Sequence, residues 1–244
     1  MADSHDFSGS KLPEKHAADI AEALLQLASD SAVRSELPGL NPYAERLSAA
    51  IEKGDPQSVE QYLVGLYAQL HSAGSNYSPS EKEILRKRNG YLSYPGGLSP
   101  IVCAERFIRP ESIVADLGAG NGLQGLLLQR FYPHRKTLQI EISAEMIRIG
   151  RIFQRALGID ADRVEWIHDD IVNVSIEDVD FVYIYRPARP HGGGGETYRT
   201  IAQKLAEMRK PVVVFSVADC LAGFLDKRFS VFYTDGHLTC FRKE

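Results

Sequence analysis

The chain contains 244 residues, of which 44% are hydrophobic and 25% are charged, a composition typical of a globular domain with one sizeable core. Its formal net charge is −4 at neutral pH. Residues 1–90 carry 9 basic and 13 acidic side chains, and residues 91–244 carry 19 of each, so neither part has the basic excess that binding to a phosphate backbone requires. This balance argues against nucleic acid as a partner and favours a small molecule.

Cysteine spacing and hydropathy give expectations about the cellular compartment of the protein. Cys103, Cys220 and Cys240 are far apart and follow no metal-ligand pattern, so we expect no metal site and a reducing, cytoplasmic environment. Residues 1–11 are polar and lack the apolar segment of a signal peptide. The longest apolar run, residues 212–218, is much shorter than the about 20 residues that a membrane-spanning helix needs. We therefore expect no contact with a membrane.

Residues 12–88 show helical patterns throughout. Apolar residues at helical spacing predict a first helix over residues 13–28. Asn41-Pro42 and Asp55-Pro56 begin two more helices, and Ser78-Pro79-Ser80-Glu81 begins a fourth, because Ser78 and Glu81 can form a capping box around a proline at the first helical position. We expect residues 1–90 to form an all-helical extension, followed by a second unit over residues 91–244.

In the second unit, short apolar runs alternate with helical segments, a pattern that predicts parallel strands with crossover helices. The predicted parallel strands cover residues 113–117, 137–142, 164–168, 181–185 and 212–217. The predicted helices between them cover residues 122–131, 144–157 and 196–209. Two further strands, 229–234 and 237–241, are joined by Asp235-Gly236, a strong signal for a two-residue hairpin. The fold class predicted is therefore α/β, with a sheet that ends in an antiparallel hairpin.

The sequence Asp116-Leu117-Gly118-Ala119-Gly120-Asn121-Gly122 joins the first predicted strand to the next helix. Its glycines permit a tight turn and a close approach of the backbone to a ligand at the helix N-terminus. Gly120, Gly122 and Gly125 also match the G-x-G-x-x-G fingerprint of dinucleotide-binding proteins, so an NAD-type oxidoreductase is an alternative. Asp116 favours a different ligand, because a carboxylate there repels a pyrophosphate and attracts the ammonium group of an amino acid.

Through this loop and the terminal hairpin, residues from about 91 to 244 resemble the class I S-adenosylmethionine (SAM)-dependent methyltransferases. The resemblance implies a Rossmann-like, seven-stranded sheet and SAM as the cofactor. Glu141, which lies 21 residues after Gly120, corresponds to the acid that binds the ribose hydroxyls, and Asp170 to the acid that contacts the adenine amino group. Asp169 is the alternative to Asp170. The cofactor-binding residues implied are Asp116, Gly118, Ala119, Gly120, Asn121, Gly122, Glu141, Ile142, Asp169, Asp170 and Ile171.

The acceptor of a methyl group is much less defined by the sequence. Tyr185 and Arg186 follow the fourth strand, where the family places substrate-facing residues, and Tyr94 lies in a segment that often covers the methionine end of the cofactor. These three residues are our catalytic candidates. The family's Asn-Pro-Pro-Tyr signature of amino-group methylation is replaced by Tyr185-Arg186-Pro187, which argues against that chemistry. Arg186 could instead bind an acidic acceptor or be a solvated loop residue.

Two other stretches have more than one interpretation. Four consecutive glycines, Gly192–Gly195, predict a mobile loop at the mouth of the site, either a lid or slack in the chain, and His191 before them is a general base or an exposed loop residue. A basic cluster of Lys82, Arg86, Lys87 and Arg88 could contact nucleic acid. The helices of residues 12–88 either cap the site or pack elsewhere. A SAM-binding protein without transferase activity is a further alternative to an enzyme.

Overall fold

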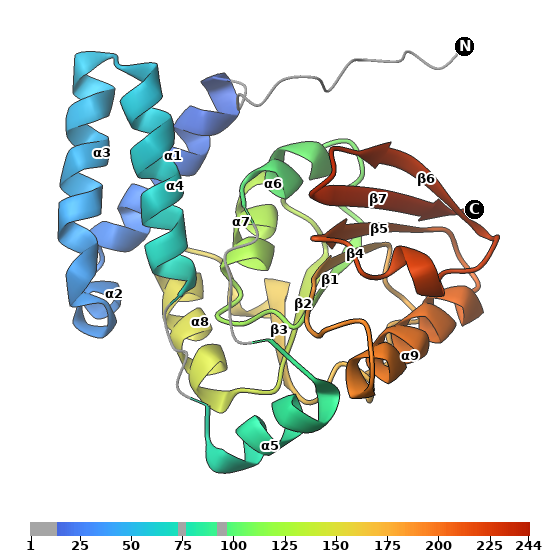
Figure 1. Cartoon of the computed structure of the whole chain (residues 1–244). Helices are drawn as coiled ribbons and strands as arrows, with labels where there is room; N and C mark the ends of the chain where they lie inside the picture. The colour runs from blue at the N-terminus through green and yellow to red at the C-terminus, as the bar shows by residue number, and fades with distance from the viewer. Residues whose placement is uncertain (1–13, 73–76, 92–96) are drawn as a thin grey trace, which may run out of the picture.

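The computed structural model of the chain describes residues 14–72, 77–91 and 97–244. A seven-stranded sheet forms its centre, with the strand order β3-β2-β1-β4-β5-β7-β6 (Figure 1). The strands are β1 (Ile113–Leu117), β2 (Lys136–Glu141), β3 (Val164–His168), β4 (Phe181–Tyr185), β5 (Val212–Val217), β6 (Phe229–Thr234) and β7 (Leu238–Lys243). Strands β1 to β5 pair in parallel, and β7 lies antiparallel between β5 and β6. This topology confirms the predicted Rossmann-like, seven-stranded sheet with its C-terminal hairpin.

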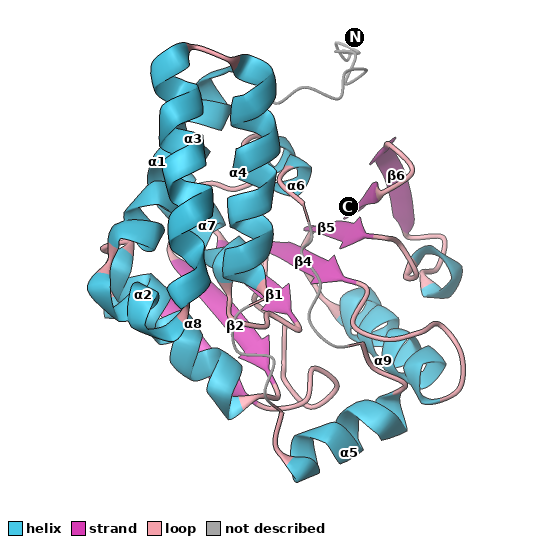
Figure 2. Ribbon diagram, turned by 60° about the vertical axis from the view of Figure 1, so that its left-hand side comes forward, coloured by secondary structure: helices cyan, strands magenta, loops and turns pink. Residues whose placement is uncertain are grey.

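Helices cover both faces of the sheet (Figure 2). One of these helices, α6 (Ser99–Ala104), comes just before β1 in the chain. The other three connect strands and are α7 (Leu123–Phe131), α8 (Ala144–Ala156) and α9 (Gly193–Glu207). Side chains of α7 and α6 pack on one face through Leu128 and Ala104, whereas α9 packs on the other through Tyr198, Ile201 and Leu205. Because each strand alternates its side chains between the faces, consecutive residues of β1 contribute to different cores.

Four of the five helices in the helical region form a layer outside α7 and α8. The helices of this region are α1 (Glu14–Ser29), α2 (Ser31–Glu36), α3 (Asn41–Lys53), α4 (Pro56–His71) and α5 (Pro79–Arg88). The predicted helix starts are confirmed at Asn41, at Pro56 and at Pro79, where the Ser78–Glu81 capping box is present. Leu24 of α1 and Leu63 of α4 are fully buried in one cluster with Phe153 of α8. Helices α1 to α4 therefore pack against the sheet's own helices, while α5 lies apart from them (Figure 2).

The four-glycine stretch differs from its prediction as a mobile loop, because Gly193–Gly195 form the first turn of α9. A Cβ at Gly193 would collide with the carbonyl oxygen of Lys87, and one at Gly194 would collide with that of Arg189. Glycine is used here because the helix start touches the backbone at the end of α5 and of the loop after β4, which leaves no space for a side chain. The run therefore serves close packing. Among the described residues, no helix is both long and apolar enough to span a membrane.

Candidate functional site

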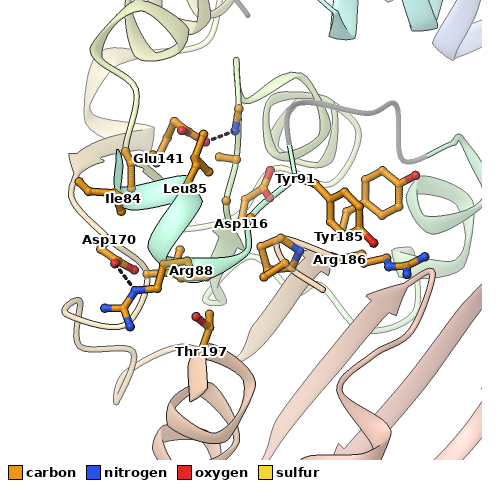
Figure 3. A pocket seen from close by; sticks show the side chains of 18 of the residues that line it. Ile84, Leu85, Arg88, Tyr91, Asp116, Glu141, Asp170, Tyr185, Arg186 and Thr197 are labelled. Carbon is orange, nitrogen blue, oxygen red and sulfur yellow. Dashed lines mark hydrogen bonds and ion pairs between the residues drawn. The ribbon is translucent and has the colours of Figure 1, made fainter. Parts of the chain in front are cut away.

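A cavity of about 320 Å³ lies at the carboxyl ends of β1, β2 and β4, where open α/β sheets bind ligands. Ten of the predicted site residues line it, namely Asp116, Gly118, Ala119, Gly120, Glu141, Ile142, Asp170, Ile171, Tyr185 and Arg186. Helix α5 runs beside the same cavity and contributes Ile84, Leu85 and Arg88 (Figure 3). The fold thus brings together residues that lie on, or directly after, four different strands, β1 to β4.

The glycine loop after β1 presents its backbone to the cavity. Gly118 and Gly120 have φ angles of 77° and 60°, in the left-handed region that other residues disfavour. The N–H groups of Gly118 and Ala119 donate to the carbonyl oxygen of Ile140 at 3.0 and 2.9 Å, which attaches the loop to β2. A ligand can therefore approach the main chain of residues 118–120 without meeting a large side chain.

Asn121 and Gly122 lie behind this loop and do not line the cavity. The side-chain amide of Asn121 donates to the carbonyl oxygens of Leu70 and His71 at 2.7 and 3.2 Å, at the end of α4. A Cβ on Gly122 would collide with the indole ring of Trp166. Both residues hold the loop in place from its far side, and their predicted contact with a cofactor stays a prediction.

Glu141 ends β2 and is buried beside the loop. One carboxylate oxygen accepts the N–H of Gly120 at 2.8 Å, a contact drawn in Figure 3, and the other accepts the N–H of Ser143 at 2.9 Å. Burial raises the pKa of Glu141, while these hydrogen bonds oppose the rise. A carboxylate has about four acceptor positions, so Glu141 keeps acceptor capacity beyond these hydrogen bonds, and it lines the cavity.

Asp116 is buried on β1, where its carboxylate accepts the N–H of Gly125 at 3.2 Å. Burial raises the pKa of Asp116 to about 7, and the nearby charge of Glu141 adds to the rise. Near neutral pH both the protonated and the ionised forms of Asp116 are therefore populated. A cation placed beside it would stabilise the ionised form and lower this pKa.

Asp170 follows β3 and forms an ion pair with Arg88 of α5, with 2.9 Å between the carboxylate oxygen and Nε (Figure 3). Its other oxygen accepts the N–H of Val172 at 3.1 Å. The alternative residue, Asp169, does not line the cavity, and its carboxylate accepts the side-chain amide of Asn173 at 2.8 Å. The structure thus places Asp170, and not Asp169, on the cavity wall, where it also anchors α5.

The inner wall contains residues that sequence reasoning missed. His71 and Tyr77 come from the helical region, and Gln124 comes from the first turn of α7. The hydroxyl of Tyr67 donates to Oε1 of Gln124 at 2.7 Å, and Nε2 of Gln124 has no hydrogen-bond partner among the described residues. Gln124 is only 2% exposed, so its unpaired amide is a buried donor on a cavity wall. Burial lowers the pKa of His71 to about 4, which keeps the imidazole neutral.

The opposite end of the cavity is lined by Tyr185, Arg186 and Tyr91 (Figure 3). The guanidinium of Arg186 lies 5.0 Å from the centre of the Tyr91 ring. Arg186 has a φ angle of 27°, unusual for a residue with a side chain. Tyr94, the third catalytic candidate, lies outside the described residues, and its role stays a prediction. His191 is exposed and does not line the cavity.

The missed residues share a physical cause. Tyr77, Leu85 and Arg88 reach the site only because α5 crosses the carboxyl ends of the strands, and no local pattern specifies where a helix docks. Gln124 is a polar residue in the mainly apolar first half of α7. This break in the apolar pattern was the one sequence signal that could have identified it as a site residue.

No protein-family model matches the sequence, and no curated protein matches it significantly. The fold is similar to several solved structures. TrmN from Thermus thermophilus aligns with a TM-score of 0.50 and 14% identity over 60% of this chain and 48% of that chain, so the match spans about half of TrmN. An RNA methyltransferase from Salinibacter ruber, solved with S-adenosyl-L-homocysteine (SAH), has a TM-score of 0.46 and 20% identity over 59% of this chain and 87% of that chain. A SAM-dependent methyltransferase from Geobacter sulfurreducens, also solved with SAH, has a TM-score of 0.40 and 23% identity over 49% and 47%. The strand order fits a class I, Rossmann-like methyltransferase fold, and the match to TrmN is a likeness of fold alone.

Proposed function

We propose that the chain is a SAM-dependent methyltransferase that acts on a small-molecule acceptor. The observation that carries the proposal is the arrangement of three carboxyl groups around one glycine loop. Asp116 on β1, Glu141 at the end of β2 and Asp170 after β3 all line one cavity. SAM offers each of them a partner, namely an ammonium group, the two ribose hydroxyls and the adenine amino group.

The other residues of the cavity fit the same cofactor. Ile142, Ile171 and Leu85 are apolar neighbours suited to the faces of an adenine ring. Gln124 lies next to Asp116, because the adjacent residue, Gly125, donates its N–H to the Asp116 carboxylate. If Asp116 binds the ammonium group of the amino-acid end, the unpaired amide donor of Gln124 is placed near the carboxylate of that end. A buried donor without a partner is costly, and a ligand that accepts its hydrogen bond removes that cost.

When bound, SAM would supply a methyl group that its positively charged sulfur already activates. The work left to the protein is to hold the two reactants in line and to exclude water. Glu141 and the loop of residues 118–120 would orient the cofactor, and α5, held by the Arg88–Asp170 ion pair, would cover it. Tyr185 and Arg186 are the acceptor-facing candidates, with Tyr94 as the candidate from the segment before α6. A general base is needed only for an acceptor that must lose a proton early.

Two features favour a small acceptor. The cavity lies under α5, and three of the four cations of the predicted basic cluster are already paired. Arg86 and Lys87 share the single carboxylate of Glu83, and Arg88 contacts Asp170, so two of the cluster's charges are offset by acidic neighbours. The similar protein from Salinibacter ruber is an RNA methyltransferase by name, so RNA belongs in the test. In this proposal residues 91–244 form the cofactor-binding unit, and residues 1–90 add His71, Tyr77 and α5 to its cavity.

Isothermal titration calorimetry of the purified chain with SAH, SAM and NAD⁺ tests the cofactor. We expect one SAH molecule to bind per chain and NAD⁺ not to bind. Binding of NAD⁺ without SAH would support the oxidoreductase alternative instead. Transfer from SAM carrying a labelled methyl group to a small-molecule fraction, but not to an RNA fraction, is the expected activity. SAH binding without transfer to either fraction would leave a non-catalytic SAM-binding protein.

A further inference from the structure

The segment after β4 holds two arginines in a rigid strip. Arg186 and Arg189 alternate with two prolines, Pro187 and Pro190, whose rings fix φ. The strip is bound along its length to the residues after α5, because the N–H of Tyr91 donates to the carbonyl of Pro187 and the N–H of Arg189 donates to that of Asn89, each at 3.0 Å. The two arginine side chains therefore start from a fixed backbone.

Both guanidinium groups contact the same aromatic ring. The guanidinium carbon of Arg186 lies 5.0 Å from the centre of the Tyr91 ring, and that of Arg189 lies 5.4 Å from it. Neither group forms an ion pair with the part of the chain that the structure describes. Arg189 makes a long hydrogen bond of 3.5 Å to the side chain of Asn89. Arg88 and Arg148, by contrast, each bind a carboxylate. Two positive charges held at one ring repel each other, and a shared anion would relieve that repulsion.

The backbone at Arg186 supports the same interpretation. Its φ of 27° lies in a region that residues with a Cβ rarely adopt, and such strain persists where surrounding contacts impose it, often at ligand-binding positions. Arg186 lines the cavity together with Tyr185 and Tyr91, at the end away from Asp170 (Figure 3). In the proposed site Asp170 binds the adenine of the cofactor. An anion at Arg186 would therefore lie at the end of the cavity away from the adenine.

We infer that Arg186 and Arg189 form a binding site for an anionic group, a carboxylate or a phosphate, on a small methyl acceptor. Guanidinium groups suit this role because their N–H donors match the paired oxygens of both anions. Contact with the Tyr91 ring favours this position of the two guanidinium groups when no anion is bound. The inference rests on the proposed methyltransferase function, since Arg186 lines the acceptor side of the same cavity and Arg189 lies at its edge, against the Tyr91 ring.

The test uses the full chain saturated with SAH and two probes, phenyl phosphate and benzoate, titrated by ligand-observed NMR. We expect at least one probe to bind and its affinity to fall at least about tenfold in Arg186→Ala and in Arg189→Ala, the size of one charge-assisted hydrogen bond. Arg46→Ala, which removes an exposed arginine from α3, should leave the affinity unchanged. Arg186→Gly should lose binding with no fall in the thermal unfolding midpoint, because glycine accepts this φ.

Separate measurements distinguish the two proposals. SAH affinity should stay within about twofold of the wild type in every arginine variant, because we assign these arginines to the acceptor. Loss of a direct interaction with SAH would instead lower its affinity about tenfold. If the wild type does not bind SAH, the proposed function fails first. If SAH binds but neither probe binds the wild type, or the arginine variants bind both probes normally, the anion site is wrong. Sub-micromolar binding of a single-stranded RNA oligonucleotide that is lost in both variants would overturn the small-acceptor assignment.

Discussion

Replacing Gln124 with leucine tests whether the buried amide recognises the amino-acid end of the cofactor. The change keeps the size of the side chain and removes the donor that has no partner in the described structure. A hydrogen bond to a charged group contributes about 1.5–3 kcal/mol, so SAH should bind roughly 10- to 150-fold more weakly. The hydroxyl of Tyr67 loses its partner at Oε1, but the orphaned donor also disappears, so we expect stability to change by less than about 1 kcal/mol.

The assay compares SAH with 5′-methylthioadenosine, which shares the adenosine and the thioether but lacks the amino-acid end. Calorimetry should show weaker binding of SAH and unchanged binding of 5′-methylthioadenosine by the Gln124→Leu variant. Gln129→Leu is the control, because Gln129 is also buried on α7 but does not line the cavity. It should lower the unfolding midpoint and leave both affinities intact. Equal weakening of both ligands by Gln124→Leu, or no weakening of either, would refute the assignment of this residue to the amino-acid end.

Other expectations concern the carboxyl groups and the glycines. Glu141→Ala should weaken SAH binding by about 1.5–3 kcal/mol in calorimetry, and an unchanged affinity would reject its ribose role. Gly120→Val should abolish SAH binding while circular dichroism shows a folded chain, because valine resists a φ of 60°; normal binding would mean that the loop is misplaced. The pKa of Asp116 is raised to about 7 by burial, and only its ionised form attracts an ammonium group, so SAH affinity should rise between about pH 6 and 8. Asp116→Asn should remove that slope, and a slope that persists would assign it to another group. Gly194→Val should lower the thermal unfolding midpoint, because its side chain would collide with the backbone of Arg189; an unchanged midpoint would contradict the packing role.

Much of the fold follows from local patterns in the sequence. The predicted bounds of β1, β3, β4, β5 and β6 agree with the structure, and those of β2 and β7 are shifted slightly. Runs of apolar residues and a two-residue turn specify these strands through interactions between residues close together in the chain. The glycine loop and Glu141 could be predicted for the same reason, because one strand, one turn and one crossover position them.

Contacts between distant segments could not be predicted in this way. The sequence alone shows a run of glycines at residues 192–195. Only the tertiary structure shows why two of them are needed, because Gly193 packs against the end of α5 and Gly194 against the loop after β4. The docking of α5 also pairs Arg88 with Asp170 across 82 positions of sequence. The hydrogen bond between Tyr67 and Gln124 likewise joins residues 57 positions apart. Local patterns record which face of a helix avoids water, whereas the partner of that face depends on the shape of the whole core, and the inner wall of the site was decided there.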